Sequence, residues 1–375
     1  MPALRQDIDP QGLLEYSVVF TDRSLNHMSQ AFQSVMRDIH GMLCDVYGAE
    51  RAVIVPGGGT YAMESVARQF ATGKRVMVIR NGFFSYRWTQ IFEMGSIPAE
   101  EIVMKARRVG EGAQAPFAPA PIEEVVARIH AEKPDLLFAP HVETASGMIL
   151  PDGYLKQVSE AVHAVGGLFV LDCIASGCAW VDMREAGVDV LISAPQKGWS
   201  APPSAGLVMM NDAALERCRA ASSTSFAMDL GKWLTIMEAF LNGGHAYHAT
   251  MPTDALRVLR DAMVETRTIG FDVLKAAQFE QGEKVRAALA KRGIKSVAAE
   301  GFGAPGVVVS YTTDPDVHTG KKFLGIGMQI AGGVPLMVDE GPDYRSFRLG
   351  LFGLDKLKDV DGSLKRLESA LDQVF

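Results

Sequence analysis

The sequence predicts an α/β fold, with a mostly parallel seven-stranded sheet flanked by helices and a smaller C-terminal α+β domain. Two observations predict it. Between residues 50 and 210, short apolar runs of strand length alternate with longer amphipathic stretches, which is typical of parallel sheets covered by helices. Hydrophobic residues make up 48% of the 375-residue chain, and such a sheet needs them because both of its faces are buried.

The elements are expected in the following order. Apolar residues from Met28 to Leu43 recur at spacings of three and four, which predicts a helix. Seven strand candidates come next, with helical patterns such as 122–131 and 155–165 between them. The strand candidates are residues 52–55, 75–79, 102–104, 136–139, 168–171, 188–192 and 207–210.

The C-terminal third of the chain has a different pattern. Residues 254–292 are helical with one break near Gly270, and strand candidates at 306–311 and 347–350 and a final helix follow them. We therefore predict three parts, which are an N-terminal segment at 1–24, a large domain at 25–270 and a small domain at 271–375.

Composition and charge exclude several classes of protein. The net charge of −7 argues against a nucleic-acid partner, because phosphate recognition normally needs a basic excess. The apolar runs are too short for a membrane-spanning helix, and the first residues are too acidic and polar for a signal peptide. The four cysteines and four of the histidines (His141, His163, His245 and His248) lack metal-ligand spacing. We expect a cytoplasmic protein with no membrane partner and no metal.

A glycine-rich turn follows the first strand candidate. Residues 56–60 read Pro-Gly-Gly-Gly-Thr and lead into a helical pattern. Unobstructed backbone N–H groups at a helix N-terminus bind phosphate. A tight turn with Thr60 as a helix cap is the alternative interpretation.

Two charged residues follow later strands. Asp172 ends an apolar strand, where a carboxylate needs a partner such as a cationic ring nitrogen or, alternatively, a backbone N–H pair. Lys197 lies between Gln196 and Gly198 in the loop after the next strand. In apolar surroundings its amine would be a nucleophile for aldehydes; the alternative is an ordinary exposed loop lysine.

The three features occur together at one sheet edge, with Lys197 placed 25 residues after Asp172. This is the arrangement that holds pyridoxal 5′-phosphate. The phosphate would bind the glycine turn, Asp172 would pair with the pyridinium nitrogen, and Lys197 would form a Schiff base with the aldehyde.

With these features the sequence resembles the class V pyridoxal-phosphate-dependent aminotransferases of fold type I, in the alanine–glyoxylate / serine–pyruvate group. The resemblance covers about residues 25–370. It rests on Gln196-Lys197 ahead of Pro202-Pro203, on the Asp172 strand end, and on the run from Tyr247 to Pro252.

The resemblance implies roles for further residues and a homodimer with shared active sites. It implies that Gly58, Gly59, Thr60 and Gln196 hold the phosphate, that Phe84 covers the cofactor ring, that Thr144 contacts the ring oxygen, that Tyr247 and Thr250 cross from the partner subunit to the phosphate, and that Arg348 binds the substrate carboxylate. Two departures stand out: residues 14–27 lack the family's Gly-Pro turn, and Pro195 replaces a common serine.

The implied function is an aminotransferase that moves an amino group from a small amino acid, of the alanine or serine type, to glyoxylate or pyruvate by a ping-pong mechanism. Lys197 would move the proton and Asp172 would keep the ring nitrogen protonated. One alternative is a 2-aminoethylphosphonate–pyruvate-type aminotransferase. Another is a catalytically silent binding protein. Cysteine desulfurase activity is disfavoured, because no cysteine follows Cys218.

Overall fold

A computed structural model describes residues 7, 9–18 and 23–375. Its centre is a seven-stranded sheet in the order β1-β11-β10-β9-β6-β2-β3. β11 runs antiparallel to both of its neighbours, and the other pairs are parallel, so the expected mostly parallel sheet is confirmed. The strands are β1 (Arg51–Pro56), β2 (Arg75–Arg80), β3 (Glu100–Lys105), β6 (Leu136–Pro140), β9 (Leu168–Asp172), β10 (Val190–Ser193) and β11 (Ala205–Met210).

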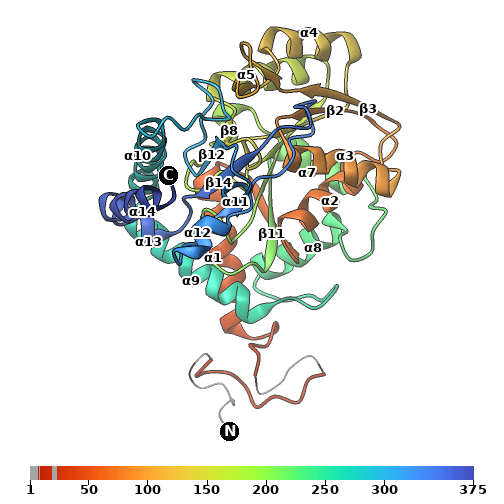
Figure 1. The fold of residues 1–375 in the computed structure, drawn as a ribbon. Helices are drawn as coiled ribbons and strands as arrows, with labels where there is room; N and C mark the ends of the chain where they lie inside the picture. Colours follow the sequence, from red (N-terminus) through yellow and green to blue (C-terminus); the bar gives the residue numbers. More distant parts are fainter. Residues whose placement is uncertain (1–6, 8, 19–22) are drawn as a thin grey trace.

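Helices cover the sheet. In Figure 1, α2, α3 and α7 lie to the right of β11, and α9 and α10 lie to its left. α1 begins where the Ser29 hydroxyl caps it by accepting from the N–H of Phe32, and it ends at Gly48, whose φ is +64°. The helices of this part are α1 (Gln30–Tyr47), α2 (Gly59–Phe70), α3 (Phe83–Gly95), α4 (Ile122–Glu132), α5 (Asp152–Ala164), α6 (Met183–Ala186), α7 (Asp212–Ala220), α8 (Leu230–Leu241) and α9 (Thr253–Ile269).

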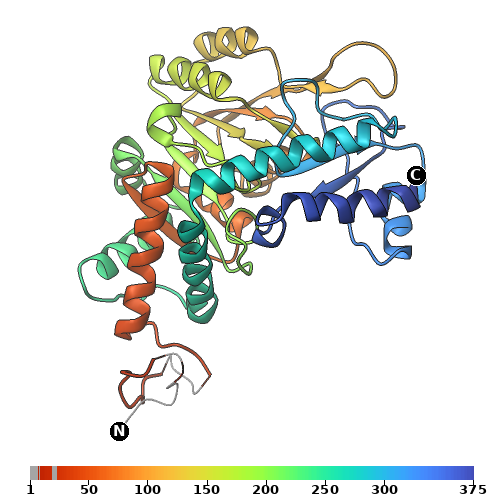
Figure 2. The ribbon, with the colours of Figure 1, turned by 90° about the vertical axis from the view of Figure 1, so that its left-hand side faces the viewer.

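The C-terminal part is built around a three-stranded sheet in the order β12-β14-β13. α10 crosses the molecule in Figure 2, with α14 running beside it. Gly270, with φ of +108°, separates α9 from α10, as the helical pattern predicted. The elements are α10 (Phe271–Ala290), β12 (Val307–Tyr311), α11 (Pro315–His318), α12 (Lys321–Gly325), β13 (Ala331–Gly332), β14 (Ser346–Gly350), α13 (Leu354–Leu357) and α14 (Val360–Val374).

The hydrophobic cores follow this arrangement. Strands of the large sheet and the helices that contact them form the largest cluster, and Val308, Phe347 and Leu371 belong to a separate cluster in the C-terminal part. A domain division at residue 270 stays a prediction. Within the described residues, no helix is both long and apolar enough to cross a membrane.

Five short strands, β13 among them, were not expected from the sequence. β4 (Arg107–Arg108) pairs with β5 (Phe117–Ala118), and β7 (Val142–Glu143) pairs with β8 (Met148–Ile149). Each has two residues, too few to display the alternation that marks a strand. The β7–β8 pair directly follows β6 and sets the path of the chain at the carboxyl edge of the large sheet.

Candidate active site

A cavity of about 510 Å³ lies where the carboxyl edge of the large sheet meets the C-terminal part. Segments distant in sequence line it, from the turn before α2 to β14. The structure brings nine of the eleven expected site residues together here. They are Gly58, Gly59, Thr60, Phe84, Thr144, Asp172, Gln196, Lys197 and Arg348.

The glycine turn presents a helix N-terminus to this cavity. Gly58 is the N-cap of α2, with an extended backbone, and as a glycine it offers no side chain to bond the first N–H groups of the helix. A Cβ at Gly59 would lie 2.5 Å from Cδ1 of Ile174, so a side chain there would displace that isoleucine. The first N–H groups of α2 and its partial positive charge therefore face the cavity without an intervening side chain, which fits a phosphate group.

Asp172 is the last residue of β9 and is buried. Its Oδ1 accepts a hydrogen bond of 2.9 Å from the N–H of Ile174. Burial raises the pKa of Asp172 to about 7; the nearby Glu143 carboxylate raises it further, whereas Arg87 lowers it. The carboxylate thus has a backbone hydrogen bond, but this bond does not offset the free-energy cost of burying the negative charge. The position therefore fits a cationic group bound in the cavity.

Lys197 lies in the loop after β10 and is half-buried. Its Nζ lies 5.1 Å from the centroid of the Phe352 ring. Burial lowers the pKa of Lys197, and the Arg348 guanidinium lowers it further. The next residue must be glycine, because a Cβ at Gly198 would lie 2.2 Å from the carbonyl oxygen of Gly177. The lysine loop is therefore packed against the turn that follows Asp172, unlike an ordinary exposed loop.

Gln196 and Arg348 complete the polar lining. The Oε1 of Gln196 is buried without a hydrogen-bond partner among the described residues, so its amide fits a polar group bound in the cavity. Arg348 lies on β14, and its Nε donates to the carbonyl oxygen of Gly332 at 2.8 Å. Burial lowers the pKa of Arg348. The donor set of the cavity thus fits pyridoxal phosphate and a carboxylate substrate together.

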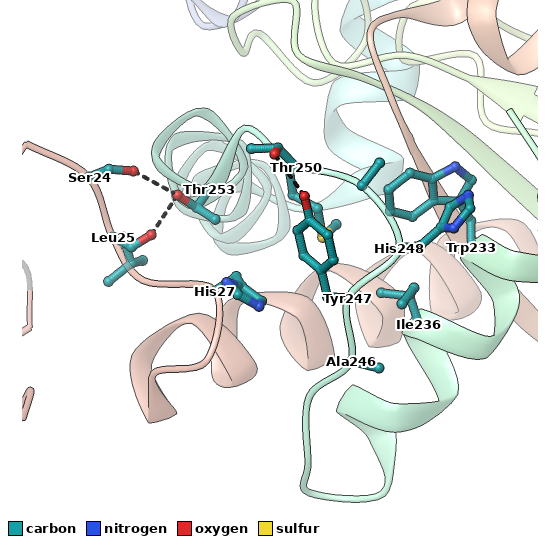
Figure 3. Close-up of a pocket in the computed structure, with 12 residues that line it drawn as sticks. Ser24, Leu25, His27, Trp233, Ile236, Ala246, Tyr247, His248, Thr250 and Thr253 are labelled. Carbon is teal, nitrogen blue, oxygen red and sulfur yellow. Dashed lines mark hydrogen bonds between the residues drawn. The ribbon is translucent and has the colours of Figure 1, made fainter. Parts of the chain in front are cut away.

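Tyr247 and Thr250 lie elsewhere in the protomer. They line a separate pocket of about 50 Å³, and their hydroxyl groups are 3.2 Å apart (Figure 3). The Tyr247 side chain is 57% exposed. Its expected contact with the phosphate of a partner subunit stays a prediction. His27 packs beside it, with ring centroids 5.7 Å apart; of the unusual residues 14–27, positions 19–22 lie outside the described residues.

Glu143 is a site residue that the sequence analysis did not select. It is fully buried, and its carboxylate accepts hydrogen bonds from the N–H groups of Phe84, Ser85 and Ala145, and from the Ser85 hydroxyl. A Cβ at Gly82 would lie 2.7 Å from Cγ and Cδ of this glutamate. Glu143 therefore fixes the start of α3, and with it the Phe84 side chain, at the edge of the cavity.

Glu143→Gln is expected to lower the free energy of unfolding by about 2–4 kcal/mol, because an amide NH₂ would replace one oxygen that accepts from N–H and O–H donors. Urea unfolding of the cofactor-free protein would measure it. Glu124→Gln is the control, since that glutamate is exposed and its ion-pair partner among the described residues is Arg107, at the surface. Equal midpoints for both variants would contradict the role of Glu143.

Across residues 7, 9–18 and 23–375, no group of three or more His, Cys, Asp or Glu side chains could hold a metal ion. His141, one of the histidines considered, is buried with its Nδ1 at 2.7 Å from the Ser176 hydroxyl.

Comparisons with known proteins agree with this geometry. No family model matches the chain. Alanine–glyoxylate aminotransferase 1 of Saccharomyces cerevisiae is 26% identical over 352 residues, covering 88% of this chain and 86% of that protein. A 2-aminoethylphosphonate–pyruvate transaminase of Paraburkholderia phymatum is 26% identical over 344 residues, covering 88% and 84%.

A solved structure extends the comparison to the fold. The structure of an alanine–glyoxylate aminotransferase from Nostoc sp. aligns with a TM-score of 0.78 at 22% identity, covering 93% of this chain and 89% of that one. This likeness confirms the fold-type I architecture. Together with the relatives, it also confirms the resemblance to class V aminotransferases.

Proposed function

We propose that this protein transfers an amino group from a small amino acid, of the alanine or serine type, to glyoxylate or pyruvate by a ping-pong mechanism. That it is a pyridoxal-phosphate-dependent transaminase follows from its relatives. The substrates and the mechanism are our inference. The observation that supports this inference is that Lys197, Asp172 and Arg348 line one cavity.

Different residues of the cavity would bind different groups of the cofactor. Gly58, Gly59 and Thr60 would bind the phosphate at the N-terminus of α2, with Gln196 as a neighbour. Phe84 would cover the ring, and Thr144 would contact the ring oxygen. When bound, pyridoxal phosphate supplies an aldehyde for covalent attachment and a ring that stabilises negative charge at the substrate α-carbon.

Two residues would perform the chemistry. The lowered pKa of Lys197 makes the neutral amine more accessible near neutral pH, and the neutral form can accept a proton at Nζ and return it at a neighbouring carbon. The Asp172 carboxylate would hold a proton on the ring nitrogen. The same charge pair would offset the burial that now raises the pKa of Asp172.

Arg348 and its neighbours would select the substrate. A guanidinium meets a carboxylate with two parallel hydrogen bonds, and Nε of Arg348 is already held by the carbonyl oxygen of Gly332. The neighbouring lining from the small sheet includes Ala331 and Gly350, which carry a methyl group and no side chain, respectively. These features support a small amino acid with one carboxylate as the donor.

Arg348→Lys is expected to raise KM for substrates with an α-carboxylate by about tenfold and to change kcat less, because a point charge cannot reproduce the bidentate fork. Steady-state kinetics with alanine and glyoxylate varied separately would test this. Arg345→Lys is the control, because Arg345 lies outside the residues that line the cavity. An unchanged KM in the Arg348 variant would remove this arginine from the substrate site.

A second candidate is transamination of 2-aminoethylphosphonate, which the relative in Paraburkholderia phymatum favours. That donor has no α-carboxylate, so Arg348 would serve mainly the keto-acid half-reaction. Single half-reactions separate the candidates: the purified holoenzyme is mixed with alanine, serine or 2-aminoethylphosphonate, and loss of its visible absorbance is followed.

Bleaching by alanine or serine but not by the aminophosphonate supports the proposal. Bleaching by the aminophosphonate supports the second candidate, whose second half-reaction, run in reverse, also consumes alanine. A protein that gains no visible absorbance on addition of pyridoxal phosphate would support the catalytically silent alternative. We further propose that the enzyme is a homodimer in the cytoplasm, with Tyr247 and Thr250 reaching the phosphate in the partner's site.

A further inference from the structure

Arg87 is a cavity residue without a role in the function proposed so far. It lies in the first turns of α3 and lines the cavity. Its Nη1 donates to the Thr60 hydroxyl at 3.0 Å, and its guanidinium carbon lies 5.1 Å from the centroid of the Phe84 ring. The side chain is therefore fixed between the glycine turn and the ring expected to cover the cofactor.

The guanidinium has no ion-pair partner among the described residues. The bond to Thr60 is its one hydrogen bond there, although an arginine carries five N–H donors. The Arg87 guanidinium lowers the pKa of Asp172, so its positive charge acts on that carboxylate across the cavity. An unpaired cation next to a helix N-terminus that also favours negative charge is the arrangement that binds an anion.

We propose that Arg87 binds the phosphate group of pyridoxal phosphate, together with the N-terminus of α2. The inference rests on the proposed function, because it takes the cavity to be the cofactor site. Thr60 would position the arginine through its hydroxyl oxygen, which accepts from Nη1. The phosphate would then have a full positive charge beside it in addition to neutral donors.

The two arginines of the cavity would thus serve different anions. Both lie near the Phe84 ring, with the Arg348 guanidinium carbon 5.7 Å from its centroid. Arg87 is tied to the glycine turn through Thr60, whereas Arg348 is tied to β13 through Gly332. One cation therefore belongs to the phosphate end of the cavity, and the other to the side formed by the small sheet.

The test compares two ligands that differ only in the phosphate. Pyridoxal phosphate and pyridoxal are titrated into the cofactor-free wild type and into Arg87→Gln, and binding is followed by tryptophan fluorescence. Loss of a charge-assisted contact is expected to weaken binding of pyridoxal phosphate by about 10- to 100-fold while changing the affinity for pyridoxal less than threefold. Arg87→Lys is expected to fall between the wild type and the glutamine variant.

Two further variants complete the design. Thr60→Val keeps the backbone N–H that would face the phosphate but removes the hydroxyl that holds Arg87, so it is expected to weaken pyridoxal phosphate binding by less than Arg87→Gln does. Arg75→Gln controls for net charge: this half-exposed arginine begins β2, at the opposite end of the strand from α3.

The outcomes are distinct. Equal affinity of the wild type and Arg87→Gln for pyridoxal phosphate would overturn the inference. An equal loss for both ligands would also overturn it, because the arginine would then act through the Phe84 ring. A wild type that binds neither ligand would overturn the proposed function itself.

Discussion

Lys197→Ala is expected to retain pyridoxal phosphate without a covalent bond and to lose transamination, with kcat lower by at least about 10³-fold. Acid–base catalysis by a positioned side chain contributes about 10²- to 10⁴-fold, and the variant also loses the amine that would attach the cofactor. The glycine turn, Asp172 and Phe84 are unchanged, so noncovalent binding should persist. Half-reactions with alanine, together with the absorbance spectrum, would measure both effects.

Chemical trapping shows whether this amine is the one that reacts. Borohydride reduction of the wild-type holoenzyme, followed by peptide mass mapping, should place the label on Lys197, and the alanine variant should carry none. Lys74→Ala is the control, because that lysine is exposed and precedes β2 at the opposite end of the strand from α3. A label on another amine, or wild-type rates in Lys197→Ala, would end the assignment.

The large sheet was predictable because its strands are continuous apolar runs. β9 is buried along its whole length, so nearly every position had to be hydrophobic, and the one exception, Asp172, marked the strand end. The edges of elements were less predictable. The sixth strand candidate, 188–192, begins at Val190 in the structure, because the Asp189 carboxylate accepts from the N–H of Phe169 and the amide of Asn211.

The residues that the sequence analysis did not select depend on contacts between distant parts of the chain. Glu143 binds the start of α3 across 58 and 59 residues of sequence, and Arg87 binds Thr60 across 27. Neither interaction has a local spacing to reveal it. Asp172 and Lys197 were found because one ends a strand and the other lies in the loop after the next strand, and parallel topology places such positions at one edge.

Asp172→Asn is expected to stabilise the cofactor-free protein at pH 8 by about 2–4 kcal/mol. Burial raises the pKa of Asp172 to about 7, whereas the unfolded chain has the ordinary value of about 4. Between these values the folded state binds a proton that the unfolded state does not. Stability from this group is therefore full below about pH 4 and is lost as the pH rises to 7.

Urea unfolding of both cofactor-free proteins at pH 5 and pH 8 would measure this effect. The asparagine mimics the protonated acid and keeps an oxygen for the N–H of Ile174, so the difference in stability between the two proteins should be smaller at pH 5 than at pH 8. Glu124→Gln, at the surface, should show no such divergence. A wild type at least as stable as the variant at pH 8 would contradict a desolvated carboxylate at this position.

The same substitution is expected to reverse its effect once cofactor is added. A pyridinium nitrogen would supply the positive charge that the Asp172 site lacks, so the wild type should gain more stability from pyridoxal phosphate than the variant does. The variant should also lose about 10²- to 10³-fold in kcat, the usual cost of removing one electrostatic partner of a reacting group. Gain of stability without cofactor and loss of activity with it would together indicate a charge kept for catalysis rather than for folding.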